Sequence, residues 1–267
     1  MDKAIASSPN ERRREADRLA DYIVGSIEAA RAVEEPFFHL EFDRVFPDDV
    51  YSQILALKPD ATDYRPMHGR SKGLDLADGT HTRVKIDLFP EYIRAMPPAK
   101  HALWDVVGRA LCSDKVRDAF VRRLAPALEK RFGVDYAKVG MYPIPILTRD
   151  IPGYLIPPHT DTHWKGITVQ LYLPGDDANT DIGTIFHEQL SDGSLQKKTQ
   201  MRFARNSGYA FAVGSDTWHS ADKVHDRVKT RDSILLTYFV DQGVMRRLRN
   251  RGKRIGNFLR NEIRRYI

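Results

Sequence analysis

The hydrophobic periodicity of the chain changes near Gly133, and this change restricts the folds that the chain can adopt. Before this residue, apolar side chains recur every three or four positions between charged ones, which predicts amphipathic helices. After it, short runs rich in β-branched and aromatic residues alternate with Pro-Gly, Gly-Asp-Asp and Asp-Gly turn signals, which is typical of antiparallel strands. The sequence therefore predicts an α+β protein in which helices support a β-sandwich or barrel.

The same pattern predicts the individual segments. In the front half we expect a helix over 9–32, a strand over 37–42, a helix that Pro59 ends, and two helices between 98 and 132. In the rear half we expect strands at 136–147, 154–156, 167–173, 184–186, 209–213 and 233–240. The polar stretch 60–82 is too long for an ordinary connection, and we expect a mobile active-site loop there.

The positive charge of the chain is concentrated in its last residues. The net charge is +6, while residues 245–267 alone contribute +8, so the other residues are close to neutral. This distribution disfavours nucleic acid as the main partner. Apolar residues recur at helical spacing within 241–267, and we expect a basic helix that packs on the barrel or forms a homodimer contact. Attraction to an anionic lipid or polymer is the alternative.

The sequence also bears on the compartment of the protein. Cys112 is the single cysteine, so no internal disulfide can form. The charged first thirty residues contain no apolar core of a signal peptide, and no run of about 18 apolar residues occurs. We therefore expect a cytoplasmic protein without a membrane span.

Two segments of the rear half carry residues suited to one metal site. His159 and Asp161 alternate along one strand and share a face, and His219 follows about sixty residues later. If the sandwich brings His219 opposite them, two imidazoles and one carboxylate occupy one side of a metal, which suits Fe(II) with its open positions. Arg231 and Ser233 share a face of the last strand, where a guanidinium and a hydroxyl can hold a carboxylate.

This ordered set resembles the iron(II) and 2-oxoglutarate dependent oxygenase superfamily. The resemblance covers about residues 136–240, and it includes 153–158 ahead of the first ligands, 169–174 after them, and 208–211 before Trp218-His219. It implies a double-stranded β-helix (jelly-roll) core over 136–240. Together with the periodicity, this predicts a single domain over 1–267, with 1–135 as mainly helical support and 241–267 as the basic helix.

The resemblance also implies the chemistry. Fe(II) would be held by His159, Asp161 and His219, and 2-oxoglutarate would bind the metal and contact Arg231 and Ser233. With O2, the cosubstrate would yield succinate and CO2, while an unactivated C–H bond of a small or medium-sized metabolite is hydroxylated. Alternatives are the same centre acting on a protein side chain, a lipid or a saccharide unit, or a catalytically inactive β-sandwich that binds a ligand.

Substrate contacts are less well defined by the sequence. Arg149 and Tyr154 lie just ahead of the first ligands, where members of the superfamily contact cosubstrate or substrate, although a solvated arginine and a core tyrosine are equal alternatives. Trp218 neighbours the distal histidine and can serve substrate or packing. Arg83 is the fourth candidate; with other basic residues of the polar stretch it can meet an anionic substrate or form a solvated surface. These others are Arg65, His68, Arg70 and Lys72.

Three other interpretations compete with the iron site. The His159 and Asp161 pair can be a hydrogen-bonded pair at a strand edge. His163 extends the run to His-x-Asp-x-His, which is compatible with a zinc hydrolase, but zinc does not explain Arg231-x-Ser233. Arg227 and Lys229 are alternative carboxylate anchors, and we favour Arg231 because it opens the apolar strand.

Overall fold

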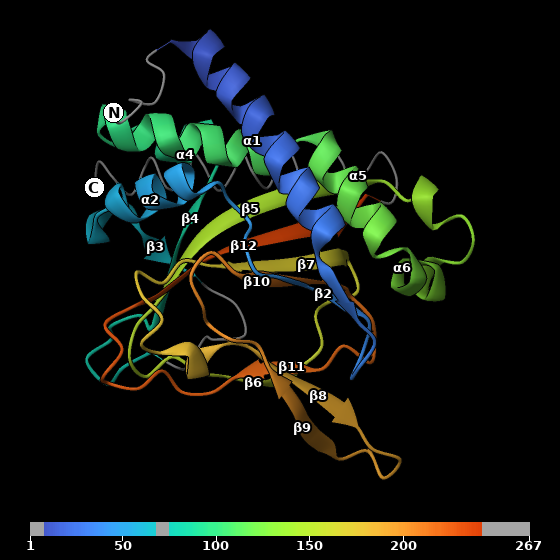
Figure 1. Cartoon of the computed structure of the whole chain (residues 1–267). Coiled ribbons are helices and arrows are strands. Elements are labelled where there is room, and N and C mark those ends of the chain that lie inside the picture. Colours follow the sequence, from blue (N-terminus) through green and yellow to red (C-terminus); the bar gives the residue numbers. More distant parts are fainter. Residues whose placement is uncertain (1–7, 68–74, 242–267) are drawn as a thin grey trace.

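The computed structural model describes residues 8–67 and 75–241. A large and a small antiparallel sheet face each other, and helices cover the outer face of the large sheet (Figure 1). The change of periodicity predicts helices that support a β-sandwich or barrel, and the jelly-roll core is the form that the resemblance implies; the structure confirms both. The predicted basic helix lies outside the described residues.

Six α-helices are described, and most of them form the outer layer (Figure 1). Their bounds are α1 (Pro9–Ala29), α2 (Asp48–Ala56), α3 (Pro90–Ile93), α4 (Pro98–Leu111), α5 (Asp114–Arg123) and α6 (Ala125–Phe132). A capping box between Ser8 and Glu11 starts α1, which packs on α4 and α5. The segment 98–132 holds three helices instead of two, because a break at Leu124 separates α5 from α6. None of the described helices is long and apolar enough to cross a membrane.

The large sheet has the strand order β1-β2-β10-β7-β12-β5-β4-β3. Its strands are β1 (Arg31–Val33), β2 (His39–Phe42), β3 (Arg65–Pro66), β4 (Arg83–Asp87), β5 (Met141–Asp150), β7 (Lys165–Tyr172), β10 (Gly208–Ala212) and β12 (Arg231–Val240). The front half thus adds strands to both edges of this sheet, beyond its predicted helical support. The predicted loop 60–82 includes β3, while His68, Arg70 and Lys72 lie outside the described residues.

The small sheet has the order β6-β11-β8-β9. Its strands are β6 (Ile156–His159), β8 (Ile185–Gln189), β9 (Leu195–Gln200) and β11 (His219–Ala221). The register of β6 and β11 places His159 directly opposite His219. The pairing of two short strands therefore brings together histidines that are far apart in the sequence.

Apolar side chains fill two layers. One lies between the helices and the large sheet and includes Trp104 and Leu236; the other lies between the two sheets and includes Phe186 and Phe211. Strand alternation turns every second residue of β12 toward the helices and turns Arg231 and its alternate neighbours toward the small sheet. A polar site can thus be built inside the sandwich without interrupting the outer core.

Candidate active site

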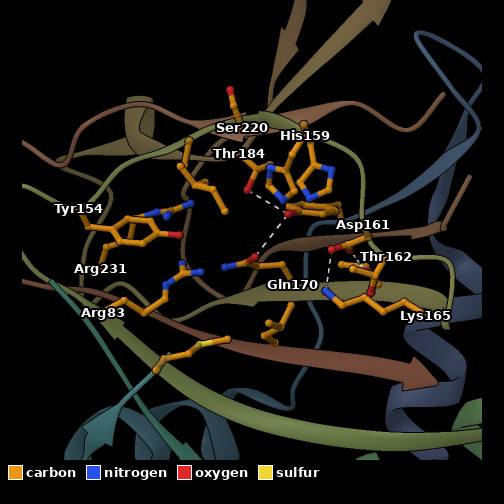
Figure 2. Close-up of a pocket in the computed structure, with 17 residues that line it drawn as sticks. Arg83, Tyr154, His159, Asp161, Thr162, Lys165, Gln170, Thr184, Ser220 and Arg231 are labelled. Atoms are coloured by element: carbon orange, nitrogen blue, oxygen red, sulfur yellow. Dashed lines mark hydrogen bonds and ion pairs between the residues drawn. The ribbon is translucent and has the colours of Figure 1, made fainter. Parts of the chain in front are cut away.

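The three predicted metal ligands line one cavity between the sheets and lie close together. Figure 2 shows His159 and Asp161 at one end of this cavity. One ligand atom from each of His159, Asp161 and His219 lies within 4.8 Å of the other two. The imidazole rings of the two histidines are 4.3 Å apart between centroids. Of the described residues, this is the group of His, Cys, Asp or Glu side chains close enough to hold a metal ion.

Hydrogen bonds fix the tautomer of both histidines. Nδ1 of His159 lies 2.9 Å from the carbonyl oxygen of Pro157, and Nδ1 of His219 lies 3.0 Å from that of Thr217. Because a carbonyl oxygen can only accept, each Nδ1 carries the proton and each Nε2 carries the lone pair. This is the tautomer that metal ligation through Nε2 requires, and the backbone partner also orients the ring.

Asp161 is held as a carboxylate by two neighbours from the large sheet. Lys165 Nζ and Thr168 Oγ1 each donate to one of its oxygens at 2.6 Å. Burial alone would raise the pKa of Asp161, but the charges of Lys165 and His219 together with these hydrogen bonds lower it to about 2. The site thus offers two imidazole nitrogens and one anionic oxygen, and a metal that binds the nitrogens would replace any proton on them. This donor set fits a divalent first-row metal such as Fe(II).

Two arginines close the far end of the cavity, opposite Asp161 (Figure 2). Arg83, Asp150 and Arg231 lie side by side on β4, β5 and β12. Arg83 binds the Asp150 carboxylate through two nitrogens at 2.6 and 2.8 Å, and Arg231 binds it at 3.1 Å. Two guanidinium groups share one carboxylate, so this end carries a net charge of about +1.

Two donors at this end have no hydrogen-bond partner among the described residues. They are Arg231 Nε and the hydroxyl of Tyr154, and both atoms are buried. The ring of Tyr154 also lies 4.0 Å from the Arg83 guanidinium carbon. Because buried polar groups are usually paired, the two donors and the excess positive charge indicate a place for an anion.

Ser233 differs from its predicted role. Its side chain is fully buried and does not line the cavity. Its Oγ lies 2.9 Å from Thr148 Oγ1 and accepts a hydrogen bond of 2.7 Å from Gln170, which does line the cavity. A direct contact between Ser233 and a ligand would require this network to rearrange, whereas Arg83 and Arg231 line the cavity directly.

The four predicted substrate contacts separate into two groups. Arg83 and Tyr154 line the cavity, whereas Arg149 and Trp218 do not. Arg149 points to the other face of β5, because it neighbours the inward-facing Asp150, and it binds Asp232 at 2.8 Å. Trp218 directly precedes His219 and is partly buried.

The competing residues lie outside the cavity. Arg227 binds Asp181 on the surface, and Lys229 is exposed. His163 is exposed, packs edge-on against Trp164 and is not part of the metal-binding group. Neither alternative anchor nor a third histidine ligand is therefore supported by the described geometry.

The sequence matches no protein-family model and no curated protein. Among solved structures, the chain is similar to a Pseudomonas putida prolyl-4-hydroxylase, with 16% identity, a TM-score of 0.47, and coverage of 84% of this chain and 100% of that chain.

Two further structures are similar. A Trichoplax adhaerens prolyl hydroxylase in complex with a hypoxia inducible factor peptide has 9% identity, a TM-score of 0.45, and coverage of 87% and 94%. A Burkholderia pseudomallei oxidoreductase of the 2OG-Fe(II) oxygenase family has 13% identity, a TM-score of 0.44, and coverage of 83% and 89%.

Several cavity residues were not identified from the sequence. Lys165, Thr168 and Gln170 of β7 line the cavity and belong to its hydrogen-bond network. Polar side chains at alternate positions of an apolar strand were the available signal for Thr168 and Gln170. Asp150 had no such signal, because its role depends on the register of three strands.

Proposed function

We propose that the chain is an Fe(II)- and 2-oxoglutarate-dependent oxygenase. One observation carries this proposal: two imidazoles and a carboxylate converge at one end of a cavity between the sheets, and two arginines that share Asp150 give the other end a net positive charge. His159, Asp161 and His219 would hold the metal and leave its remaining positions open. Bound Fe(II) would supply activation of O2, with 2-oxoglutarate converted to succinate and CO2.

The cavity suits the cosubstrate in size and charge. Its volume is about 230 Å³, below the range of about 300–1,000 Å³ that is usual for drug-sized ligands, so it suits a small dicarboxylate. Arg231 and Arg83 would bind the distal carboxylate, with Tyr154 as a neutral donor beside them. The other carboxylate would then point toward the metal ligands.

The remaining wall residues orient the cosubstrate and exclude water. Gln170, Thr184 and Tyr209 are joined by hydrogen bonds along one wall. Ile156 and Leu235 add apolar surface to the cavity. A dry, pre-organised wall protects a reactive centre from side reactions with solvent.

As substrate we propose a small or medium-sized metabolite that is hydroxylated at an unactivated carbon. A protein side chain, a lipid or a saccharide unit is the alternative substrate for the same centre. The cytoplasmic location and the homodimer formed through the basic helix stay predictions.

The proposal is tested without knowledge of the substrate. Anaerobic addition of 2-oxoglutarate to the Fe(II)-loaded protein should give the weak visible charge-transfer band of a chelated keto acid. His159→Ala should abolish the band, and Arg231→Ala should require about ten- to a hundredfold more 2-oxoglutarate, because a charge-assisted hydrogen bond contributes about 1.5–3 kcal/mol. Arg227→Ala, which removes an exposed arginine, is the matched control and should leave the titration unchanged. Folded wild-type protein without a band would overturn the proposal.

A further inference from the structure

A second and larger cavity lies beside the metal ligands. Its volume is about 870 Å³. Four separate segments form it: residues 34–38 between β1 and β2, the side of α6, residues 160–163 after β6, and residues 212–217 at the end of β10 and beyond it. Its size falls within the range of about 300–1,000 Å³ that is typical of pockets for drug-sized molecules.

The segment 159–163 separates the two cavities. His159 and Thr162 line the smaller cavity, while Thr160 and His163 line the larger one. Asp161 is the one residue of the described chain that lines both. A molecule in the larger cavity would therefore lie against a metal ligand, on the other side of this segment from the cosubstrate.

The floor of the larger cavity is apolar. Phe37 and Val213 are buried residues of the layer between the sheets, and Phe38 is partly buried beside them. Pro126 and Ala127 contribute the facing surface from α6. Burial of a hydrocarbon body against this floor would provide the main binding free energy.

The positive charges of this cavity are already engaged. Lys130 binds Asp216 across the rim at 2.7 Å. Arg131 donates hydrogen bonds to the backbone carbonyls of Lys165 and Val213. It thereby joins α6 to the start of β7 and to the residue that follows β10. Arg131 and Glu34 show no ion pair among the described residues, and the hydrogen bonds of Arg131 are directed to carbonyl oxygens. The lining carries two cations, Lys130 and Arg131, and three carboxylates, Glu34, Asp161 and Asp216, so its net charge is about −1. An anion would thus lose hydration here and meet an excess of negative charge.

We propose that the larger cavity holds the molecule to be oxidised, and that it selects a medium-sized molecule with an apolar body and no anionic group. This inference rests on the proposed function, since that function assigns the smaller cavity to 2-oxoglutarate. The two cavities then sort their ligands by charge: the arginine-closed cavity takes the dicarboxylate, and the larger cavity with its apolar floor takes the neutral or cationic substrate. Their shared wall carries the metal ligand Asp161.

The test uses a matched pair of aromatic probes, neutral 2-naphthol and anionic naphthalene-2-sulfonate, with Mn(II) in place of Fe(II). Proton relaxation of each probe is measured by NMR, because nuclei bound near the paramagnetic ion relax faster. We expect enhanced relaxation of 2-naphthol, and binding of the sulfonate that is weaker by about tenfold or more. Saturating 2-oxoglutarate should not displace 2-naphthol.

Two variants locate the binding site. Ser215 is an exposed residue that lines the larger cavity, so Ser215→Trp should fill the cavity and abolish the relaxation effect on 2-naphthol. Ser194→Trp places the same side chain in the exposed turn between β8 and β9, and should leave the effect unchanged. Calorimetry should show unaltered 2-oxoglutarate binding in both variants.

The outcomes separate this inference from the proposed function. If 2-oxoglutarate binds but Ser215→Trp leaves the relaxation effect intact, or if the sulfonate binds as tightly as 2-naphthol, the assignment of the larger cavity is wrong. If the Mn(II)-loaded protein does not bind 2-oxoglutarate at all, the proposed function is wrong, and the role of the larger cavity as substrate chamber is lost with it.

Discussion

Asp150 controls the charge at the closed end of the cosubstrate cavity. Its fully buried carboxylate accepts hydrogen bonds from both Arg83 and Arg231. Asp150→Asn would leave two buried guanidinium groups without a counter-charge, so we expect a loss of about 3 kcal/mol in the free energy of unfolding. Urea denaturation measures this loss, and 2-oxoglutarate should stabilise the variant more than it stabilises the wild type.

A matched control is available at the surface. Asp216 forms an exposed ion pair with Lys130, and such pairs contribute about 0–1 kcal/mol. Asp216→Asn should therefore change the free energy of unfolding by less than Asp150→Asn does. Equal effects of the two substitutions would contradict the conclusion that Asp150 balances the charges of both Arg83 and Arg231.

Asp161 gives the metal-free protein a defined pH dependence. Its pKa is about 2 in the folded protein and about 3.9 in an unfolded chain, so the unfolded state binds the proton first as the pH falls. The carboxylate therefore stabilises the fold fully above about pH 4 and loses this contribution between about pH 4 and pH 2. The shift corresponds to about 2–3 kcal/mol.

The measurement compares wild type with Asp161→Asn by urea denaturation at several pH values. The difference in the free energy of unfolding should be largest near neutral pH and should shrink as the pH falls below about 4. A difference that is independent of pH would contradict the lowered pKa of Asp161.

For single residues, the spacing of neighbours in the sequence predicted the site better than it predicted contacts between distant strands. His159, Asp161 and His219 could be predicted to form one metal-binding group because His159 and Asp161 are close in the sequence. The prediction that both lie on one strand was wrong, because β6 ends at His159 and Asp161 lies in the loop that follows it. The partnership of Arg83 with Asp150 spans 67 positions. It depends on which strands become neighbours, which a short motif does not encode.

At the scale of elements, Gly108 lets the helix α4 lie directly against the backbone of Leu88. A Cβ on Gly108 would lie 2.3 Å from the carbonyl oxygen of Leu88. Gly108→Ala should therefore lower the free energy of unfolding by about 1–3 kcal/mol, since the helix and the end of β4 must separate. Urea denaturation measures the change.

Gly25 in α1 is the matched helical control. A Cβ added there meets no atom within 4 Å. Gly25→Ala should stabilise the protein by about 0.5–1 kcal/mol, because alanine loses less backbone entropy in a helix. If both substitutions stabilise the protein, the close approach of α4 to Leu88 is not a packing constraint.

The long elements were predictable, and the short exposed ones were not. The helix α1 and the strands β7, β10 and β12 have strong periodic or apolar patterns. The strand β9 is mostly exposed and contains Lys197 and Lys198, so it lacks such a pattern. β1 and β3 have three and two residues, too few for periodicity to identify them.

For the whole molecule, metal binding should connect the two sheets. His159 and His219 belong to the small sheet, whereas Asp161 is bound by Lys165 and Thr168 of the large sheet. Mn(II) at about 100 times its Kd should raise the free energy of unfolding by about 2.7 kcal/mol, because a ligand of the native state stabilises it by mass action.

Hydrogen exchange shows where this stabilisation acts. Amides of β6 and β11 should gain more protection on addition of Mn(II) than amides of α1 and α4, which lie on the outer side of the large sheet (Figure 1). Chelation of the metal by EDTA should reverse the gain. Protection spread evenly over the chain, or none at all, would contradict a metal site between these strands.

The central place of β12 constrains the order of events during biosynthesis. This strand comes late in the chain, yet it lies between β7 and β5 and pairs with both. A nascent chain that has not yet released residues 231–240 from the ribosome holds two half-sheets, each with an unpaired inner edge, and lacks Arg231. Such edges promote pairing with other chains. Premature termination should therefore yield aggregating fragments, and the cavity can close only after translation has passed β12.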